Sequence, residues 1–392
     1  MKPYDVIVVG MGPGGSAASY KLASKGLDVL AIDKDSFPRY KPCGGCISTK
    51  VNSIQDLNFD SVIEGTIYGA TFTYRSARHM DIISDSCLGY NVMRDRFDAL
   101  MMERARSSGV NVLEGKRVKG VKESDGLITV MTDSGERYSS RYLVGADGAG
   151  GVIGREYFGF TPKACAVTIT AEVPLERGRR DDLDGRLFID FGGVPYGYSW
   201  IFPKEEFLSI GLATEAERVK VRGYLDELIS SHDVLRGIKV DKTVGWTMPL
   251  YYSSSKDVVK GRAVVIGDAG HLVDPFLGEG IYFSIRTAEI AADIIVEEAD
   301  KDGADLGAYQ DVIKKELYPE FDAALKLSRL AYNHPRIWYK TLEGDPKIME
   351  QYYNVIRGEE TYPAFYGWLI DRLKAKPWKL AKGWLESRFF QA

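Results

Sequence analysis

The N-terminal segment contains the feature that most constrains the fold. Asp5–Val9 is a short β-branched run, the pattern of a strand buried on both faces of a parallel sheet. It leads directly into the glycine-rich run Gly10–Gly15, and then into a helix-compatible segment that ends near Gly26. A second apolar run, Leu27–Ile32, closes on Asp33. This order predicts dinucleotide binding: a strand, a G-x-G-x-x-G turn, a helix, a second strand and an acid.

The residues of this turn have separate physical roles. Gly10 allows the tight turn, Gly12 lets the backbone approach a pyrophosphate, and Gly15 lets the helix pack closely on the strand. The N-terminus of the helix faces the phosphate charge, and the acid after the second strand accepts the ribose hydroxyls. The alternative is a glycine-rich turn in another α/β fold, and the motif alone does not choose between NAD and FAD. We expect the cofactor-binding residues to include Gly10, Gly12, Pro13, Gly14, Gly15, Asp33 and Lys34.

Composition excludes several classes of protein. The chain has 51 Lys and Arg against 55 Asp and Glu, a net charge of −4, so no global charge favours nucleic acid. Four cysteines in 392 residues cannot form a secreted disulfide scaffold. The sequence has no apolar run of about 18 residues, so we predict no transmembrane helix. No signal peptide fits before the first strand, and we predict a cytoplasmic protein.

Two later segments each have a buried strand that ends in glycine and aspartate. Arg141–Val144 leads into Gly145-Ala146-Asp147-Gly148, and Ala263–Ile266 leads into Gly267-Asp268. A turn with Pro275, Gly278 and Gly280 follows the second strand, and an apolar-periodic helix starts at Ile281. Together with the N-terminal motif, these segments resemble the para-hydroxybenzoate hydroxylase-like flavoproteins.

That resemblance implies that the cofactor is FAD. It implies that Asp268 binds the ribityl chain, and that Pro275 and the turn Gly278–Gly280 lie beside the isoalloxazine ring. The helix N-terminus at Ile281 would then stabilise negative charge on the reduced flavin. Arg94, in an R-x-x-F-D helix start, matches the arginine that meets the FAD phosphates. The alternatives are a plain turn at Asp147-Gly148 and a solvated helix charge at Arg94.

A different composition lies between these segments. Thr66–Ile83 is strand-like, and four further strands are expected, divided by Gly and Pro turns, at Ala166–Val173, Arg186–Phe191, Tyr198–Phe202 and Phe207–Ala213. We predict an α/β protein with a Rossmann-like FAD-binding domain, an inserted, mostly antiparallel β-sheet substrate domain and a helical C-terminal part. The predicted FAD-binding domain comprises 1–65, 91–160 and 250–300, the substrate domain 66–90 and 161–249, and the C-terminal region 301–392.

Within the inserted sheet, one segment narrows the resemblance. Tyr198-Ser199-Trp200-Ile201-Phe202-Pro203 fits the Y-x-W-x-F-P signature of the geranylgeranyl reductase family. Lys41–Gly45 fits that family's P-C-G segment, and Gly278–Phe283 fits its flavin-adjacent turn. The resemblance implies reduction of isolated C=C bonds in polyprenyl chains of isoprenoid lipid, chlorophyll or quinone precursors. The last hundred or so residues add little to it.

The aromatic residues of the signature suit such a substrate. Tyr198, Trp200 and Phe202 alternate, so they point to one face of their strand and form an aromatic wall; the alternative is ordinary sheet core. An isolated alkene is a poor hydride acceptor, and aromatic faces could stabilise carbocation-like charge while a proton is delivered. By family likeness Cys43 is the candidate proton donor, and Cys43 and Gly44 are expected among the cofactor-binding residues. We therefore name Cys43, Tyr198 and Trp200 as catalytic residues.

Several questions stay open at the level of sequence. Cys43-x-x-Cys46 could be a redox pair, a disulfide or a structural loop; without a second C-x-x-C or a His pair we predict no metal site. No second G-x-G-x-x-G occurs, so the electron donor is NAD(P)H bound without its own Rossmann domain, or reduced ferredoxin. His271 stands in the flavin turn, where a packing role is at least as good an interpretation.

A rival function is an FAD-dependent monooxygenase or halogenase of the same class. The segment from Gly197 to Pro203 approaches the halogenase pattern G-W-x-W-x-I-P, but Tyr198 and Phe202 replace the expected Trp and Ile.

The C-terminal segment Asp371–Ala392 interleaves aromatic and basic residues. It contains six Lys or Arg and two acids, with Trp378, Trp384, Phe389 and Phe390 between them. This pattern is typical of an interfacial helix, with rings at the headgroup level and cations toward anionic lipid. The alternative is a helix that packs its tryptophans on the protein and leaves its lysines in water. We therefore hypothesise peripheral contact with the inner membrane face, where isoprenoid substrates would reside.

Overall fold

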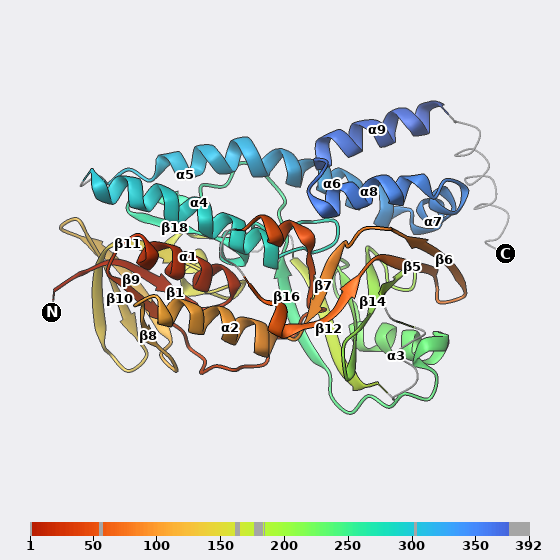
Figure 1. Cartoon of the computed structure of the whole chain (residues 1–392), viewed down its shortest axis with the longest axis horizontal. Helices are drawn as coiled ribbons and strands as arrows, with labels where there is room; N and C mark the ends of the chain where they lie inside the picture. Colours follow the sequence, from red (N-terminus) through yellow and green to blue (C-terminus); the bar gives the residue numbers. More distant parts are fainter. Residues whose placement is uncertain are drawn as a thin grey trace. The chain divides into compact units, whose positions relative to one another are not determined.

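The structure of the chain is a computed structural model, and it describes residues 2–54, 58–160, 165–175, 183, 185–301 and 304–375 (Figure 1). The chain divides into two compact units, each assembled from three segments. The first unit comprises Met1–Lys41, Arg94–Ala164 and Met248–Asp322, and the second comprises Pro42–Met93, Cys165–Thr247 and Ala323–Ala392. None of the helices in the described ranges is long and apolar enough to cross a membrane.

A largely parallel sheet forms the centre of the first unit. Its strand order is β17-β18-β11-β1-β2-β8, and β10 adds to β11 and β9 to β10 in antiparallel pairs. β1 lies between β11 and β2, with Val8 opposite both Val144 and Ala31. The strands are β1 (Tyr4–Val9), β2 (Val29–Ile32), β8 (Asn111–Leu113), β9 (Val118–Ser124), β10 (Leu127–Thr132), β11 (Arg137–Gly145), β17 (Val259–Lys260) and β18 (Ala263–Val265).

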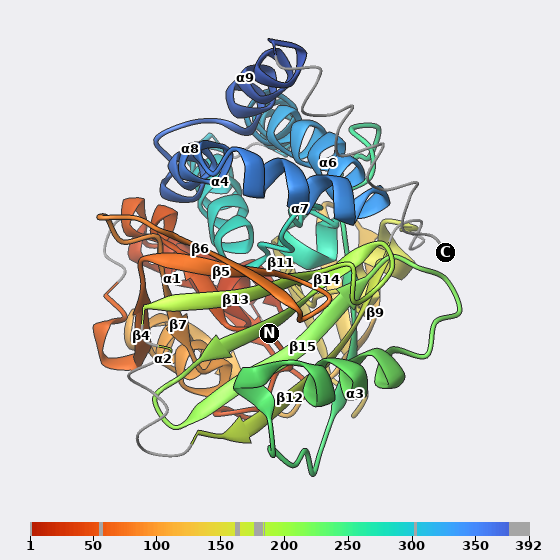
Figure 2. The same cartoon turned by 90° about the vertical axis from the view of Figure 1, so that its right-hand side faces the viewer.

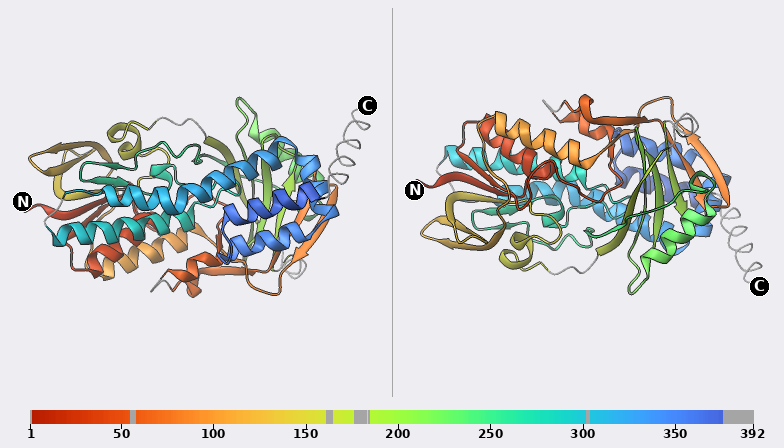
Figure 3. Two further views of the ribbon diagram at one scale, coloured as in Figure 1. Left: turned by 90° about the horizontal axis from the view of Figure 1, so that it is seen from above. Right: turned by 90° about the horizontal axis from the view of Figure 1, so that it is seen from below.

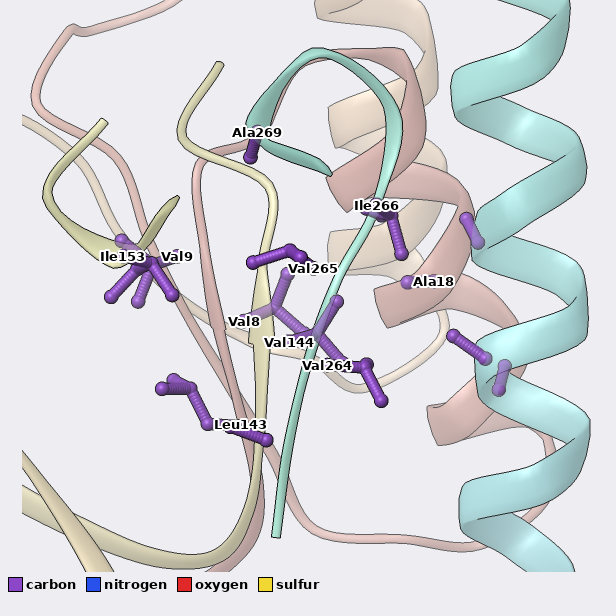
Figure 4. Close-up of a cluster of buried hydrophobic side chains, with 14 of the residues drawn as sticks. Val8, Val9, Ala18, Leu143, Val144, Ile153, Val264, Val265, Ile266 and Ala269 are labelled. Carbon is purple, nitrogen blue, oxygen red and sulfur yellow. The ribbon is translucent and has the colours of Figure 1, made fainter. Parts of the chain in front are cut away.

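Helices cover this sheet because its central strands are apolar on both faces. Val8, Val144 and Val264 are completely buried, and Ala18 of α1 packs in the same core (Figure 4). Seen from above, α4 and α5 lie side by side (Figure 3, left). The helical elements are α1 (Pro13–Ser24), α2 (Arg94–Ser107), α4 (Ile281–Asp300), α5 (Gly307–Val312), two short π-helices (Ile153–Tyr157 and Ile313–Leu317) and a 3-10 turn (Gly267–Gly270).

The second unit is built on a seven-stranded sheet with the order β16-β12-β15-β14-β13-β5-β6. β13 and β5 pair in parallel. The pairs β12–β15, β15–β14 and β14–β13 are antiparallel. These strands are β5 (Gly69–Tyr74), β6 (Arg78–Ile83), β12 (Cys165–Pro174), β13 (Arg186–Phe191), β14 (Gly197–Pro203), β15 (Phe207–Thr214) and β16 (Val244–Pro249). A small sheet has the order β3-β7-β4, with β3 (Cys46–Ser48), β4 (Ile63–Ile67) and β7 (Gly89–Val92).

Helices also pack on the seven-stranded sheet. α3 lies on the face of β12 and β15 (Figure 2), where Leu225 and Leu228 are buried against Ile169 and Leu212. α8 is attached to the sheet through Tyr353, whose hydroxyl accepts the Ala70 N–H at 3.1 Å and donates to the Ile82 carbonyl at 2.8 Å. The helical elements are α3 (Val221–Ser231), α7 (Pro335–Gly344), α8 (Lys347–Arg357), α9 (Tyr362–Ala375) and 3-10 turns at Thr49–Ser53, Asp60–Val62 and Asp233–Leu235; α6 (Tyr318–Asn333) has residues in both units.

The predicted strands of the inserted sheet are confirmed to within one residue at each end. The run Thr66–Ile83 is not one strand: it is the end of β4 and the β5–β6 hairpin, whose turn includes Arg75 and Ser76 at positive φ. The second unit also contains 42–65, which sequence analysis assigned to the FAD-binding domain. This grouping follows from pairing, since β3 and β4 both bond to β7. The predicted three-part functional division stays a prediction.

Candidate functional site

The glycine turn of the first unit builds an open cradle at the N-terminus of α1. Gly10 has a φ of +96°, and a Cβ on Gly15 would lie against the Gly10 carbonyl oxygen, so these two glycines close the turn onto the helix. At Gly12 the situation is opposite, because within the described residues a Cβ would have one neighbour, Arg39 Nη2 at 3.7 Å. No side chain caps the helix among the described residues. The start of α1 is therefore free to bind an anion.

Asp33 fixes the shape of this turn. Its carboxylate accepts the Met11 N–H at 2.6 Å and the Asp35 N–H at 2.8 Å. Burial raises its pKa, while these two hydrogen bonds and the nearby Arg39 oppose that rise. A carboxylate has about four lone-pair positions, so the buried Asp33 keeps acceptor capacity for ribose hydroxyls. Lys34, also predicted to bind the cofactor, is exposed.

Arg39 was missed by the sequence analysis. Its Nη1 is buried and lies 3.0 Å from Asp98 Oδ2, yet it makes no hydrogen bond to the described protein. Arg94, the predicted phosphate contact, donates from Nε and Nη2 to the two oxygens of Asp98 at 2.8 and 2.7 Å. The buried Asp98 thus orients both arginines. The only sequence signal for Arg39 was a basic residue shortly after Asp33.

The Asp147–Gly148 turn has a polar atom without a partner. Asp147 Oδ2 accepts the Ile153 N–H at 3.0 Å, whereas Oδ1 is buried and bonded to nothing in the described chain. Burial raises the pKa of this carboxyl to about 6. Gly148 has a φ of +75° and open space where a Cβ would be. A buried acceptor next to open backbone fits a ligand with hydroxyl groups.

The predicted flavin turn precedes α4. Asp274 is buried and accepts the Phe276 N–H at 2.7 Å, which orders the backbone around Pro275. Gly278, at a φ of +70°, donates its N–H to the Asp274 carbonyl at 3.1 Å, and Gly280 is the N-cap of the helix that begins at Ile281. Asp268 makes no side-chain hydrogen bond within the described ranges, and it lies 3.3 Å from the Cβ position of Gly280. Its carboxylate is therefore available to a ribityl hydroxyl.

His271 is a packing residue in this turn. Its ring contacts Phe160 edge-on, and its Nδ1 lies 2.7 Å from Lys256 Nζ. Burial and the lysine lower its pKa to about 4, so it is neutral at physiological pH. These contacts agree with the packing interpretation.

The second unit contains the aromatic wall. Successive rings of Tyr198, Trp200 and Phe202 have centroids 6.2 Å apart, which confirms that the three share a face of β14. Trp200 and Phe202 are 6% and 8% exposed. Trp200 faces Gly211 on β15, where a Cβ would meet the indole ring, so this glycine makes room for the tryptophan. We call Tyr198, Trp200 and Phe202 the aromatic row.

Two contacts of the aromatic row were not predicted. Tyr332 of α6 stacks on Tyr198 with ring centroids 6.0 Å apart, and it also contacts Phe191. Gly44 lies on the other end, where a Cβ would be 2.7 Å from the Phe202 ring and 3.4 Å from Trp200 Nε1. The row therefore runs from the Cys-Gly-Gly segment to α6. Tyr332 gives no local signal in the sequence, because it is more than a hundred residues from Tyr198.

All four cysteines are free thiols, so the Cys43–Cys46 pair is not a disulfide in this structure. Lys204, immediately after the signature, is buried against the same segment and was also missed. A lysine after a buried run is normally expected at the surface, which is why sequence reasoning passed over it.

Comparisons with known proteins show the family to which the chain belongs. Residues 3–177 match the FAD binding domain family. The chain is 30% identical over 335 residues to an uncharacterised protein of Methanosarcina barkeri, with 85% of each chain covered. It is 30% identical over 303 residues to the geranylgeranyl diphosphate reductase of Rhodobacter capsulatus, with 74% of each covered. The chain belongs to the geranylgeranyl reductase family. It is an FAD-dependent oxidoreductase, as predicted.

Other relatives and solved structures extend this result. The digeranylgeranylglycerophospholipid reductase of Methanocaldococcus jannaschii is 28% identical over 309 residues, covering 74% of this chain and 76% of the relative. A geranylgeranyl bacteriochlorophyll reductase-like protein of Thermoplasma acidophilum superposes with a TM-score of 0.75 at 24% identity, covering 84% and 87%. The flavin-dependent brominase Bmp2 gives 0.76 at 19% identity, covering 96% and 100%. These superpositions confirm the fold class.

The residues of the first unit fit FAD. The open helix N-terminus, the buried Arg39 nitrogen and the unpaired Asp147 oxygen are the polar groups that a pyrophosphate and its sugars would satisfy. FAD would thus be held by the glycine turn, Arg39, Asp33 and Asp268.

Proposed function

We propose that the protein reduces isolated C=C bonds in the polyprenyl chains of isoprenoid lipid, chlorophyll or quinone precursors. The observation that carries this proposal is the aromatic row, closed by Gly44 at one end and Tyr332 at the other. Away from its head group an isoprenoid offers only apolar contact, and stacked aromatic side chains supply that contact. The names of the Rhodobacter and Methanocaldococcus relatives, both reductases of geranylgeranyl compounds, support the substrate class.

The row also suits the charge that develops during reduction. When FAD is bound and reduced, it supplies the hydride. Protonating one alkene carbon places positive charge on the other, and the faces of Trp200 and Tyr198 would stabilise that charge. The row itself contributes aromatic faces and no charged side chain.

Cys43 is our proposed proton donor. Its carbonyl accepts the Ser209 hydroxyl at 3.4 Å and its sulfur accepts the Gly45 N–H at 3.3 Å, so the residue is held from two sides. With a lone pair engaged by that N–H, the thiol hydrogen points away from Gly45 and is available to a substrate. Tyr198 and Trp200 remain the other proposed catalytic residues.

The electron donor is proposed to be NAD(P)H or reduced ferredoxin. Each can be mixed anaerobically with the oxidised protein while the loss of flavin absorbance is followed. A donor bleaches the flavin within the time of turnover, and a non-donor leaves the absorbance unchanged.

Peripheral membrane contact is proposed through Asp371–Ala392. Residues 376–392 lie outside the described residues. Within the described part, Arg372 donates from Nε and Nη2 to the two oxygens of Asp345, both at 2.8 Å, and stacks on Trp368. Lipid binding would therefore depend on the later lysines rather than on Arg372. Flotation with anionic vesicles tests this: a chain ending at Lys376 should lose binding that the full chain has, and equal binding by both would remove the tail from the mechanism.

One experiment tests the proposed reaction. The purified flavoprotein is reduced anaerobically with dithionite and mixed with a geranylgeranyl lipid. We expect flavin reoxidation that requires the alkene, together with a product that has gained pairs of hydrogens. Reoxidation that requires O₂ and gives an oxygenated or halogenated product would instead support the monooxygenase or halogenase function.

A further inference from the structure

Lys204 is a buried cation solvated entirely by backbone. It is 2% exposed, and its ammonium donates to the carbonyls of Gly44 at 2.7 Å, Gly45 at 3.0 Å and Val92 at 3.1 Å. These three bonds use all three N–H groups of the ammonium. A charge is costly to bury unless it is fully hydrogen-bonded, so this arrangement fixes the Gly44–Gly45 backbone firmly.

One of these bonds connects Lys204 to the Cys43 thiol. The carbonyl of the Gly44–Gly45 peptide accepts from the ammonium, and the N–H of the same peptide donates to Cys43 Sγ at 3.3 Å. In a planar trans peptide the C=O and N–H point in opposite directions. A cation on the oxygen therefore polarises the peptide and strengthens its N–H as a donor to sulfur. A stronger donor favours the negatively charged form of the sulfur.

The groups around Lys204 keep its ammonium protonated. Burial lowers the pKa of Lys204 to about 8, so most of it is charged at neutral pH; the groups that face it and oppose the shift are Cys46, Cys43, Glu64 and Glu172. Of these, Glu64 is buried and accepts the Glu205 N–H at 3.2 Å.

We propose that Lys204 is the positioning residue of the Cys43 thiol, which it orients and shifts toward the thiolate through the Gly44–Gly45 peptide. The inference rests on the proposed function, in which Cys43 donates the proton. There the S–H bond breaks, the proton goes to one alkene carbon, and the other carbon receives the hydride whose electrons come from NAD(P)H or ferredoxin. The thiolate then takes a proton from water. Stabilising the thiolate makes the thiol a better acid at neutral pH.

Cys87 serves as an internal control, because its hydrogen bond runs in the opposite direction to that of Cys43. Its thiol donates to the Gly89 carbonyl at 3.5 Å, whereas the sulfur of Cys43 accepts an N–H. Both side chains are partly exposed and both can be followed in one sample.

The test is the pH profile of iodoacetamide alkylation of the FAD-loaded full chain, resolved for each cysteine by mass spectrometry, from about pH 6 to about pH 10. We expect the Cys43 midpoint to lie about one pH unit below that of Cys87. In Lys204→Met the Cys43 midpoint should rise by about the same amount and the Cys87 midpoint should not move. A Cys43 midpoint that is unchanged in this variant would overturn the inference.

A second variant separates loosening of the segment from loss of the charge. Ser209→Ala removes the hydroxyl bond to the Cys43 carbonyl without touching Lys204, so it should leave the midpoint in place; a shift as large as that in Lys204→Met would overturn the inference. If Lys204→Met does not fold, the wild-type comparison decides, because a Cys43 midpoint at or above that of Cys87 contradicts the proposal. Alkylation needs no prenyl substrate, so a failure of the proposed reaction would be seen separately as absence of alkene reduction by the wild type.

Discussion

The two units present different side chains at their candidate sites. Around the glycine turn of the first unit, Arg39 Nη1 and Asp147 Oδ1 are buried without hydrogen bonds, and the backbone at Gly12 faces open space. In the second unit the buried charge of Lys204 is fully used by three carbonyls, and the surface beside it is aromatic. Polar groups that can take further partners suit a polar ligand, and a row of aromatic rings suits an apolar ligand. We therefore propose that the first unit binds the charged dinucleotide and the second the hydrocarbon chain.

The largest effect that can break this comparison is expected at Gly12. Gly12→Val should abolish FAD binding while the protein stays folded, because its Cβ would enter the open space at the helix N-terminus and meet only Arg39. Gly120→Val, in β9, is the matched control. Among the described residues, a Cβ at Gly120 would contact Met131 Cε, at 3.7 Å. The readouts are flavin absorbance and the melting temperature. Full flavin occupancy in Gly12→Val would show that the cradle is misassigned.

Gly44 tests the other unit in the same way. Gly44→Ala places a Cβ 2.7 Å from the Phe202 ring, so the Cys-Gly-Gly segment must move off the aromatic row. Small displacements of a reacting group cost up to about a hundredfold in rate. We therefore expect kcat for alkene reduction to fall by about that factor with FAD binding retained. Gly223→Ala in α3, where nothing lies within 4 Å, should keep wild-type kcat.

A smaller effect is expected from truncating the row. Trp200→Ala removes a buried indole and should cost about 3 kcal/mol of folding stability and about tenfold in rate. It should also change which double bonds of a polyprenyl chain are reduced, since the wall no longer fixes the position of the chain. Product analysis by mass spectrometry measures this. An unchanged product pattern would favour ordinary sheet core at this position.

The smallest effect concerns Asp147. Its pKa is raised from 3.8 to about 6 by burial, so the folded protein binds more protons than the unfolded chain between these values. Its contribution to folding stability therefore declines as pH rises through this window. Asp147→Asn removes the titration, so the stability of the variant relative to wild-type apoprotein should rise across the same window. Urea unfolding at several pH values checks this, and a relative stability that falls with pH would contradict it.

The parts of the fold and site that depend on neighbouring residues could be predicted from the sequence. Gly10 and Gly15 are required by backbone contacts within one turn, so a local motif was enough to predict that part of the fold and the FAD cradle. The alternation of Tyr198, Trp200 and Phe202 likewise gave the aromatic row. These signals are local because turn geometry and strand alternation depend on neighbouring residues.

Other parts of the site could not be found in this way. Tyr332 reaches Tyr198 through the packing of α6, and the partners of Lys204 come from two segments far earlier in the chain. Burial of a lysine contradicts the usual preference of that residue, so only the three carbonyls explain its position. Arg39 was missed for a similar reason, because its orientation depends on Asp98 of α2. Contacts across long sequence separations leave no local pattern.

Lipid mass spectrometry is the most direct test of the proposal that this flavoprotein saturates prenyl double bonds. The chain is expressed in a host that makes geranylgeranylated lipids, with the flavin-free Gly12→Val variant as the control. We expect lipids heavier by two hydrogens for each reduced double bond in the wild-type strain, and unchanged lipids in the control strain. Unaltered prenyl chains in both strains, despite full flavin occupancy of the wild type and an active electron donor, would contradict it.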